Sequence, residues 1–304
     1  MKRLGRKLIR TVQAIGRGLS TVPNAEPKCT GIGLALGGGF ARGIAHIGVI
    51  KVLEEENIPI QFVAGTSVGA LIGAAYCSGL SCDELEEIAM QVRFRSFASW
   101  TLSRYGFASN QRMIGFLNRI LKVKTFEELR IPLAVTATDF STGDGVVFRS
   151  GPLVDPVRAS CAYPGMFLPV KIGGRMLIDG MLAHAVPSVP LREMGASRLL
   201  AVHLKGNWIS GDGPRHLFDV IGQCFAIAQE KTSDRWRQAA DLVIEPDVNG
   251  FKYDDFERTE ALIRMGEVVA RSAVGEIKKW LQVESSKTKA VSAGLPQTAV
   301  APAE

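Results

Sequence analysis

The chain has 304 residues, of which 46% are hydrophobic, so it can bury the core of one large α/β domain or of two small ones. This share excludes a chain that is disordered throughout. The formal net charge of +6 comes from six basic residues in an N-terminal stretch that has no acidic residue. The rest of the chain is neutral, and a nucleic-acid-binding protein is therefore not indicated.

The stretch of residues 1–28 is interpreted as a basic amphipathic arm. Its apolar residues recur three or four positions apart: Leu4, Leu8, Val12, Ile15 and Leu19. This spacing puts them on one face of a helix, with basic residues around it. Such a helix either lies on an anionic membrane through residues 1–20 or packs against the folded body. Neither a secretory signal peptide nor a membrane-spanning helix is expected.

The five cysteines include no Cys-x-x-Cys pair, so neither a disulfide framework nor a zinc site is expected. Reduced thiols fit a cytoplasmic protein. Such a protein is either dissolved in the cytoplasm or bound peripherally to the inner face of the membrane. Nothing in the sequence requires a metal ion or an organic cofactor.

Residues 29–282 are predicted to form one domain in which strands alternate with helices. Strands are expected at 30–36, 60–64, 132–138, 146–149, 170–179, 199–203 and 242–245, and helices at 43–56, 68–78, 215–239 and 255–282. The strand region 170–179 is expected to be a hairpin around Gly173-Gly174. This alternation predicts an α/β three-layer sandwich with a mostly parallel central sheet covered on both faces.

Three other stretches complete this prediction. Capping-box patterns, Ser81 with Glu84 and Thr125 with Glu128, mark two further helix starts. The aromatic and basic stretch 93–111 has no clean period and is interpreted as an irregular, partly mobile excursion. Residues 283–304 are rich in Ser, Thr, Ala and Pro and are expected to be a disordered tail.

A G-x-S-x-G pattern lies between the second strand and the apolar helix that follows it: Gly65, Thr66, Ser67, Val68 and Gly69. A sharp strand–turn–helix of this kind holds a serine in a strained conformation with its hydroxyl exposed. The helix N-terminus under the oxygen favours developing negative charge. The sequence therefore predicts a nucleophile elbow with Ser67 as the nucleophile.

The turn Gly37–Gly43 (GGGFARG) lies in the same way between the first strand and its helix. Its consecutive N–H groups suit an anion. A nucleotide phosphate is not indicated, because no Lys-Ser/Thr pair follows the glycines. A dinucleotide is not indicated either, because the next strand ends in Gly65, whereas dinucleotide-binding proteins have an acidic residue there. The remaining anion is the oxyanion of an acyl-transfer intermediate. Arg42 either stabilises that anion or forms a structural salt bridge.

The base that would activate Ser67 is not fixed by these patterns. His46 is interpreted as a packed helix residue, while His184 and His203 can each in principle complete a triad. Asp179 ends a strand before Gly180, a signal that by itself is typical of a turn.

The chain resembles the bacterial patatin-like phospholipase family over about residues 30–245. The resemblance rests on four motifs: LALGGGFARGIAHIGVIKVLEE, AGTSVGALIGAAYCSG, ASCAYPGMFLPV and IDG. It implies a Ser67–Asp179 dyad in place of a triad and places the acyl pocket along Ala159–Val170. It also implies an oxyanion hole from the first turn, formed by Gly37, Gly38, Gly39, Phe40, Arg42 and Gly43.

The sequence departs from the family pattern at two positions. Phe40 stands where the family commonly has glycine, and because it does not easily adopt a positive φ, Gly38 and Gly39 are the preferred oxyanion donors. The base motif reads Asp179-Gly180-Met181, where the family usually has Gly or Ala in third place. Met181 therefore either crowds the dyad or shapes an apolar pocket.

Taken together, these features predict a serine hydrolase of phospholipids or other lipid esters that acts through an acyl-enzyme. Two other classes remain open. An acyltransferase of the malonyl-transacylase type would need a histidine partner for Ser67, and a non-catalytic lipid-binding regulator would bind lipid without reacting.

Overall fold

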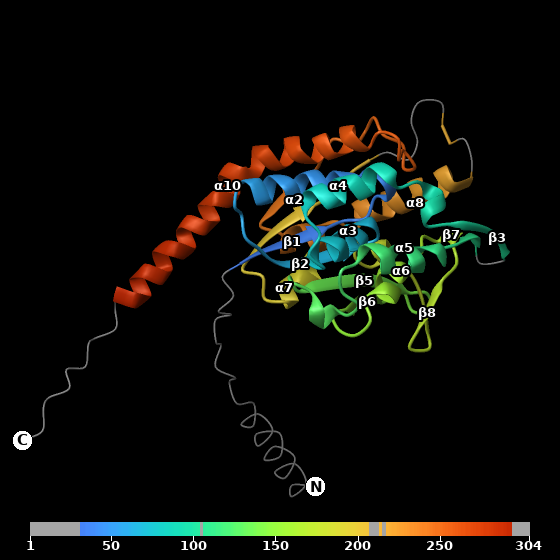
Figure 1. The fold of residues 1–304 in the computed structure, drawn as a ribbon, viewed down its shortest axis with the longest axis horizontal. Coiled ribbons are helices and arrows are strands. Elements are labelled where there is room, and N and C mark those ends of the chain that lie inside the picture. Colours follow the sequence, from blue (N-terminus) through green and yellow to red (C-terminus); the bar gives the residue numbers. More distant parts are fainter. Residues whose placement is uncertain (1–30, 104–105, 207–212, 215–216, 294–304) are drawn as a thin grey trace, which may run out of the picture.

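The computed structural model describes residues 31–103, 106–206, 213–214 and 217–293. These form an α/β body with a long helix along one side (Figure 1). The predicted arm 1–28, the final residues 294–304 and His216 lie outside the described residues. Within the described part of the chain no helix is both long and apolar enough to cross a membrane.

The central sheet has eight strands, in the order β11-β10-β1-β2-β5-β9-β8, with β6 paired to β5. Their bounds are β1 Ile32–Leu36, β2 Ile60–Thr66, β5 Leu133–Asp139, β6 Gly145–Phe148, β8 Val170–Ile172, β9 Arg175–Asp179, β10 Arg198–Val202 and β11 Leu242–Ile244. The strands from β11 to β5 are all parallel, whereas β6, β9 and β8 are antiparallel to their neighbours. The predicted hairpin around Gly173-Gly174 is confirmed as β8–β9.

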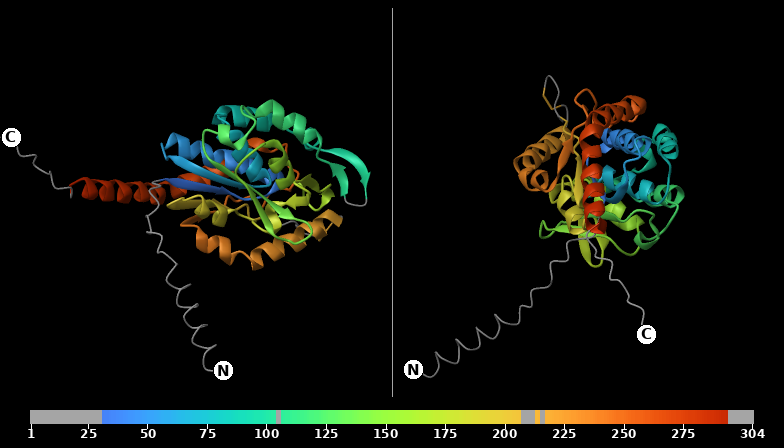
Figure 2. Two further views of the ribbon diagram at one scale, coloured as in Figure 1. Left: turned by 90° about the horizontal axis from the view of Figure 1, so that it is seen from below. Right: turned by 90° about the vertical axis from the view of Figure 1, so that its left-hand side faces the viewer.

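Helices cover both faces of this sheet (Figures 1 and 2). They are α2 Ala45–Glu55, α3 Val68–Cys77, α4 Cys82–Gln91, α5 Arg112–Ile120, α6 Val154–Ser160, α7 Ser188–Glu193, α8 Leu217–Lys231, α9 Asp234–Ala239 and α10 Thr259–Ala293. Short 3-10 turns are η1 Phe40–Ile44, η2 Phe94–Ser96, η3 Phe126–Glu128 and η4 Gly180–Leu182.

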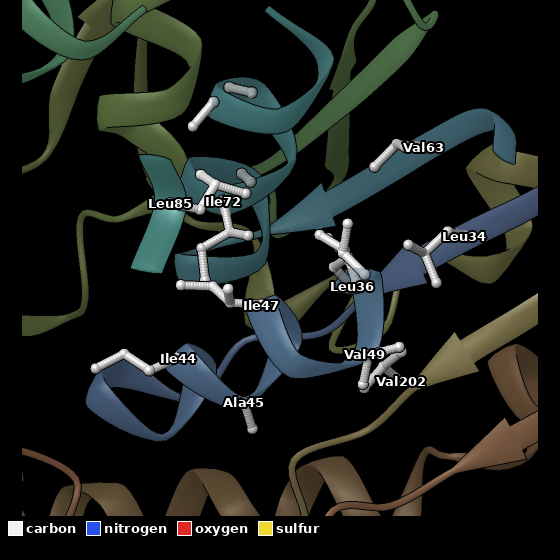
Figure 3. Close-up of a cluster of buried hydrophobic side chains, with 14 of the residues drawn as sticks. Leu34, Leu36, Ile44, Ala45, Ile47, Val49, Val63, Ile72, Leu85 and Val202 are labelled. Atoms are coloured by element: carbon white, nitrogen blue, oxygen red, sulfur yellow. The ribbon is translucent and has the colours of Figure 1, made fainter. Parts of the chain in front are cut away.

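Successive side chains along each strand point to opposite faces of the sheet, and both faces are buried. Leu34 and Leu36 of β1 point into the cluster formed with α2, α3 and α10 (Figure 3), whereas Ala35 between them belongs to the cluster under α7 and α9. Strand β10 divides in the same way, with Leu200 on the first face and Ala201 on the second. Because both faces are buried, these strands read as continuous apolar runs. The predicted three-layer α/β sandwich is confirmed.

The stretch 93–111, predicted to be irregular, is instead ordered into η2 and the hairpin β3 Ser99–Ser103 and β4 Gly106–Ser109. Strand β4 pairs in parallel with β7 Gly165–Phe167, which gives a second, three-stranded sheet. The prediction was wrong because the partner strand lies about sixty residues further along the chain, and no local period reveals it.

Three boundary predictions also differ from the structure. The single helix expected at 215–239 is divided into α8 and α9. The Ser81–Glu84 capping box is present at the start of α4, but Thr125 and Glu128 cap only the three-residue turn η3. Helix α10 continues to Ala293, so the helix ends later than residue 282, where the tail was predicted to begin.

Candidate active site

Ser67 lies at the sharp turn between β2 and α3, with φ of 55° and ψ of −124°. A positive φ at a residue with a side chain costs on the order of 1–3 kcal/mol and persists only where the surroundings impose it. The surroundings here are close backbones: a Cβ on Gly69 would lie 2.2 Å from the carbonyl oxygen of Leu36, and one on Gly65 would lie 2.5 Å from Cα of Ala70. Only glycine fits at these two positions, and the turn is held tight.

The topology of β5 brings Asp179 to this serine. Thr66, the last residue of β2, pairs with Thr136 of β5, and the next residue of β5, Ala137, pairs with Asp179 of β9. Strand β6 occupies the opposite edge of β5. Strands β2 and β9 therefore lie end to end along the same edge of β5. Ser67, which follows β2, lies next to Asp179, the last residue of β9.

The two side chains are joined directly. The hydroxyl of Ser67 donates a hydrogen bond of 2.7 Å to Oδ2 of Asp179, and Oδ1 accepts the Met181 N–H at 2.9 Å. The backbone N–H of Asp179 donates to the carbonyl of Ala162, and the hydroxyl of Thr138 donates to the carbonyl of Asp179. Both carboxylate oxygens have a donor, so the carboxylate is held in one orientation.

Asp179 is fully buried and Ser67 is 9% exposed. Burial, which disfavours the charged carboxylate, raises the pKa of Asp179 to about 7, although hydrogen bonds from Ser67 and Met181 oppose this shift. A carboxylate with this pKa can accept a proton near neutral pH.

Ser160 is a site residue that the sequence analysis did not single out. Its buried hydroxyl accepts the Ser67 N–H at 2.7 Å, which fixes the backbone of the elbow and removes this N–H from the set of anion donors. The neighbouring Cys161 lines a cavity beside Ser67. The only sequence signal for Ser160 is its place in the motif ASCAYPGMFLPV.

The turn Gly37–Gly43 runs beside the elbow, because a Cβ on Gly38 would lie 3.4 Å from Cβ of Ser67. The Gly38 N–H already donates to the carbonyl of Ala185 at 3.2 Å, and the Gly37 N–H donates to Val202. Gly39, in contrast, shows no hydrogen bond from its N–H to any described residue. Of the two preferred oxyanion donors, Gly39 is the one with an uncommitted N–H.

Phe40 does adopt a positive φ, of 53°, contrary to the expectation from its side chain. Its ring packs edge-on against the rings of Tyr163 and Tyr253, with ring centroids 4.7 Å and 5.8 Å apart. Aromatic pairs of this geometry contribute about 0.5–1.5 kcal/mol each, which offsets the backbone strain.

Three further residues hold the turn in place. The ring of His46 bonds through Nε2 to the Gly37 carbonyl at 2.8 Å, and burial lowers the pKa of His46 to about 4, so the ring is neutral and donates. Arg42 is buried and donates from Nε to the carbonyl of Phe251 at 3.0 Å. A Cβ on Gly43 would lie 2.2 Å from the side chain of Val68.

The remaining motif residues support the elbow from behind. The hydroxyl of Thr66 donates to the carbonyl of His184 at 2.7 Å and lies 2.7 Å from the hydroxyl of Thr136. Gly180 is in tight contact with β5, since a Cβ there would lie 2.4 Å from the Thr136 carbonyl. Met181 lines a polar cavity beside the dyad.

Two cavities meet at Ser67. One is apolar and extends between α3, α4 and α5, lined by residues that include Leu71, Ala75, Leu85, Ile88, Met113 and Phe116. The other is polar and extends toward α8, lined by residues that include Asp179, His203, Lys205, Gln223, Gln229 and Glu230. Phe40 and Tyr163 line both and stand at the junction. The predicted pocket segment Ala159–Val170 contributes Cys161, Tyr163 and Phe167 to the apolar cavity.

Neither alternative histidine bonds to Ser67. His203 lines the polar cavity, but its Nδ1 lies 2.9 Å from Glu245. His184 lies beside Gly145, where a Cβ would come within 2.3 Å of its Nε2. Among the described residues no group of three His, Cys, Asp or Glu side chains is placed to hold a metal ion.

Comparison with known proteins gives the following matches. The sequence model of a family described as patatin-like phospholipase matches residues 34–191, more than half of the chain. An uncharacterized NTE family protein of Mycobacterium tuberculosis is 35% identical over 179 residues, which are 58% of this chain and 49% of that protein. Lysophospholipase NTE1 of Mycosarcoma maydis is 30% identical over 230 residues, which are 72% of this chain and 12% of that protein.

Among solved structures, VipD from Legionella pneumophila matches with a TM-score of 0.47 and 13% identity, over 81% of this chain and 66% of that one. The chain spans about half of the length of the mycobacterial relative and a smaller part of the fungal one.

Proposed function

Since the chain belongs to the patatin-like phospholipase family, we propose that it is a serine hydrolase of lipid esters, with Ser67 as nucleophile and Asp179 as general base. The observation that carries the proposal is the 2.7 Å hydrogen bond from the Ser67 hydroxyl to the buried Asp179 carboxylate. It gives the hydroxyl a proton acceptor at the point where Ser67 lines both cavities.

In the first step Asp179 takes the proton of Ser67 while Oγ attacks the ester carbonyl carbon. The carbonyl oxygen becomes an oxyanion, and the alcohol leaves with the proton held by Asp179. In the second step Asp179 takes a proton from water, which attacks the acyl-enzyme and releases the fatty acid. Ser67 regains its proton, so the enzyme returns to its starting state.

The oxyanion needs donors other than Ser67 and Gly38, whose N–H groups are bonded to Ser160 and Ala185. The Gly39 N–H is the donor that the described residues leave uncommitted. Helix α3 begins directly after Ser67, and its N-terminal dipole adds a favourable potential for negative charge.

The two cavities fit the two sides of a lipid ester. The apolar cavity suits the acyl chain, and the polar cavity suits the alcohol part with its head group. Lys205 in the polar cavity is compatible with an anionic phosphate, so a phospholipid or lysophospholipid is the proposed substrate class. The name of the fungal relative, a lysophospholipase, agrees with this class.

The decisive experiment is a hydrolysis screen of the purified chain and its Ser67→Ala variant. The substrates are a phospholipid, a lysophospholipid, an acylglycerol and short p-nitrophenyl esters. We expect the native chain to hydrolyse at least one lipid ester and Ser67→Ala to lose all hydrolysis while remaining folded. Ser272→Ala, on the exposed side of α10, is the matched serine control and should retain full activity.

A fluorophosphonate probe separates this proposal from its two rivals. Labelling at Ser67 that disappears in Asp179→Asn supports the dyad. Lipid binding without any labelling would favour a non-catalytic binder. Loss of turnover in His203→Ala or His184→Ala, with Asp179→Asn still active, would favour the acyltransferase class.

A further inference from the structure

Large apolar side chains are exposed at one end of the molecule. Trp100 of β3 is 81% exposed, Phe107 of β4 46%, and Leu217 and Val220 of α8 61% and 42%. Phe107 contacts Phe218 of α8 with ring centroids 5.9 Å apart, so the hairpin and the helix adjoin. Both lie at the end of the body toward which β1 points (Figures 1 and 2). We call Trp100, Phe107, Leu217 and Val220 the apolar rim.

Helix α8 is apolar on two faces. Its inner face carries Phe218, Ile221 and Phe225, which pack on the cluster around Tyr163. Its outer face carries Leu217 and Val220. Ile227, seven residues after Val220, is also exposed but lines the polar cavity. A surface helix normally has one apolar face, and a second one marks a contact with something apolar.

The chain around the hairpin is strongly basic. Residues 88–126 contain seven basic residues and no acidic one: Arg93, Arg95, Arg104, Arg112, Arg119, Lys122 and Lys124. Arg93, Arg95 and Arg112 are exposed, and none of the three forms an ion pair with a described acidic residue. Aromatic side chains flanked by unpaired cations are typical of a surface that binds anionic lipid.

The apolar rim is also joined to the interior. Trp100 and Phe107 line a surface groove together with Phe94 and Phe256. Phe94 and Phe256 in turn line the apolar cavity that reaches Ser67. Through these two rings the groove adjoins the cavity at Ser67, although its far wall also carries charged side chains: Lys252, Asp254, Asp255 and Glu257.

We propose that the apolar rim and the exposed arginines beside it dock the protein on an anionic lipid surface, with the hairpin β3–β4 and helix α8 facing the bilayer. This inference rests on the proposed function, because a lipid substrate is what the docked cavity would receive. Charge favours a lipid surface over a second copy of the chain, which would bring the same basic stretch against itself.

The test measures binding of the full chain, carrying Ser67→Ala to prevent turnover, to sedimented phosphatidylcholine vesicles with and without phosphatidylglycerol. We expect binding that is stronger with phosphatidylglycerol and weaker at high salt. The double variant Trp100→Ser/Leu217→Ser should lower the vesicle partition coefficient by about tenfold or more. Arg95→Gln should lower it by about threefold, and only with the anionic lipid.

Two matched controls lie on α10. Val268→Ser removes an apolar side chain that is 60% exposed, and Lys279→Gln removes a cation whose side chain is 69% exposed. Both should bind vesicles like the parent. In the chain with Ser67 intact, Trp100→Ser/Leu217→Ser should hydrolyse p-nitrophenyl butyrate at the native rate, which shows that its fold and site are unchanged.

Three results would overturn the docking proposal. The first is equal vesicle binding by the parent and Trp100→Ser/Leu217→Ser. The second is binding that is lost only when the six basic residues of the arm are changed to Gln, which would assign docking to residues 1–28. The third is a native dimer that the rim variant converts to a monomer in sedimentation velocity. Failure of the proposed hydrolase differs from all three, because it abolishes butyrate hydrolysis and leaves vesicle binding unchanged.

Discussion

The apolar cavity between α3, α4 and α5 and the polar cavity beside α8 meet at Ser67, Phe40 and Tyr163 but differ in the rest of their walls. The first is walled by aliphatic and aromatic side chains, whereas the second carries a carboxylate, an imidazole and an ammonium group. A molecule held in both at once must be apolar at one end and polar at the other, and its bond at the junction must be the one that reacts. The difference between the two cavities therefore predicts an amphipathic substrate.

Hydrolysis of a substrate held in both cavities requires the Ser67–Asp179 dyad where they meet. In Asp179→Asn the amide oxygen can still accept the Met181 N–H, and the amide nitrogen can donate to Ser67 Oγ, so the geometry is kept while the proton acceptor is lost. We expect kcat/KM for a soluble ester to fall by about 10³-fold. The measurement is initial rate against substrate concentration for native and variant proteins.

Asp144→Asn, in an exposed turn, is the matched control and should retain the native rate. An Asp179→Asn variant with more than a tenth of native activity would show that another group serves as the base.

The second prediction concerns pH. Because burial raises the pKa of Asp179 to about 7, the carboxylate is protonated below that pH and cannot accept a proton. We expect kcat/KM for p-nitrophenyl butyrate to rise about tenfold per pH unit well below pH 7 and to level off above it, at about 100-fold its value at pH 5. A profile that is flat between pH 5 and pH 8 would contradict Asp179 as the base.

Stability should change with pH in the opposite direction. The folded state holds the Asp179 proton up to about pH 7, while the unfolded state releases it near pH 4, so the free energy of unfolding falls as pH rises between these values. Asp179→Asn lacks this loss, and its thermal midpoint should exceed that of the native protein at pH 8. Thermal unfolding of both proteins at pH 5 and pH 8 tests the sign.

The apolar cavity is tested by filling it. Ala75 lies on α3 eight residues after Ser67, about 12 Å along the helix axis, and lines the cavity. Ala75→Phe should leave hydrolysis of p-nitrophenyl butyrate within about twofold and lower that of the palmitate by about tenfold or more, because only the longer chain reaches the new ring. The measurement is the ratio of the two kcat/KM values.

Ala75→Ser, which keeps the size of the side chain, is the control and should keep the native ratio. An equal loss on both esters in Ala75→Phe would mean that the substitution disturbs the site or the fold, and an unchanged ratio would place the acyl chain elsewhere.

The sequence predicted the part of the site that local pattern determines. The elbow around Ser67 follows from a strand, a tight turn and an apolar helix in order, and the structure has that order. Asp179 was selected by resemblance alone, because its nearness to Ser67 depends on β2 and β9 meeting along one edge of β5, a long-range pairing.

The same limit explains the elements that were missed. Hairpin β3–β4 is paired to the distant β7, and Ser160 acts through a contact ninety-three residues from Ser67. The positive φ of Phe40 depends on packing against Tyr163 and Tyr253, which lie far along the chain. Local propensity cannot report contacts of this range.

The polar cavity gives the smallest expected effect. Lys205 lies at its wall and forms an exposed ion pair with Glu230 at 3.0 Å. Exposed pairs contribute about 0–1 kcal/mol, so a phosphate head group can compete with Glu230 for Lys205 at little cost. Lys205→Gln should raise KM for a lysophospholipid about threefold and leave KM for a neutral monoacylglycerol unchanged. A rise in KM for the charged substrate alone would place the head group in the polar cavity. An equal rise in KM for both substrates would mean that Lys205 only supports the cavity wall.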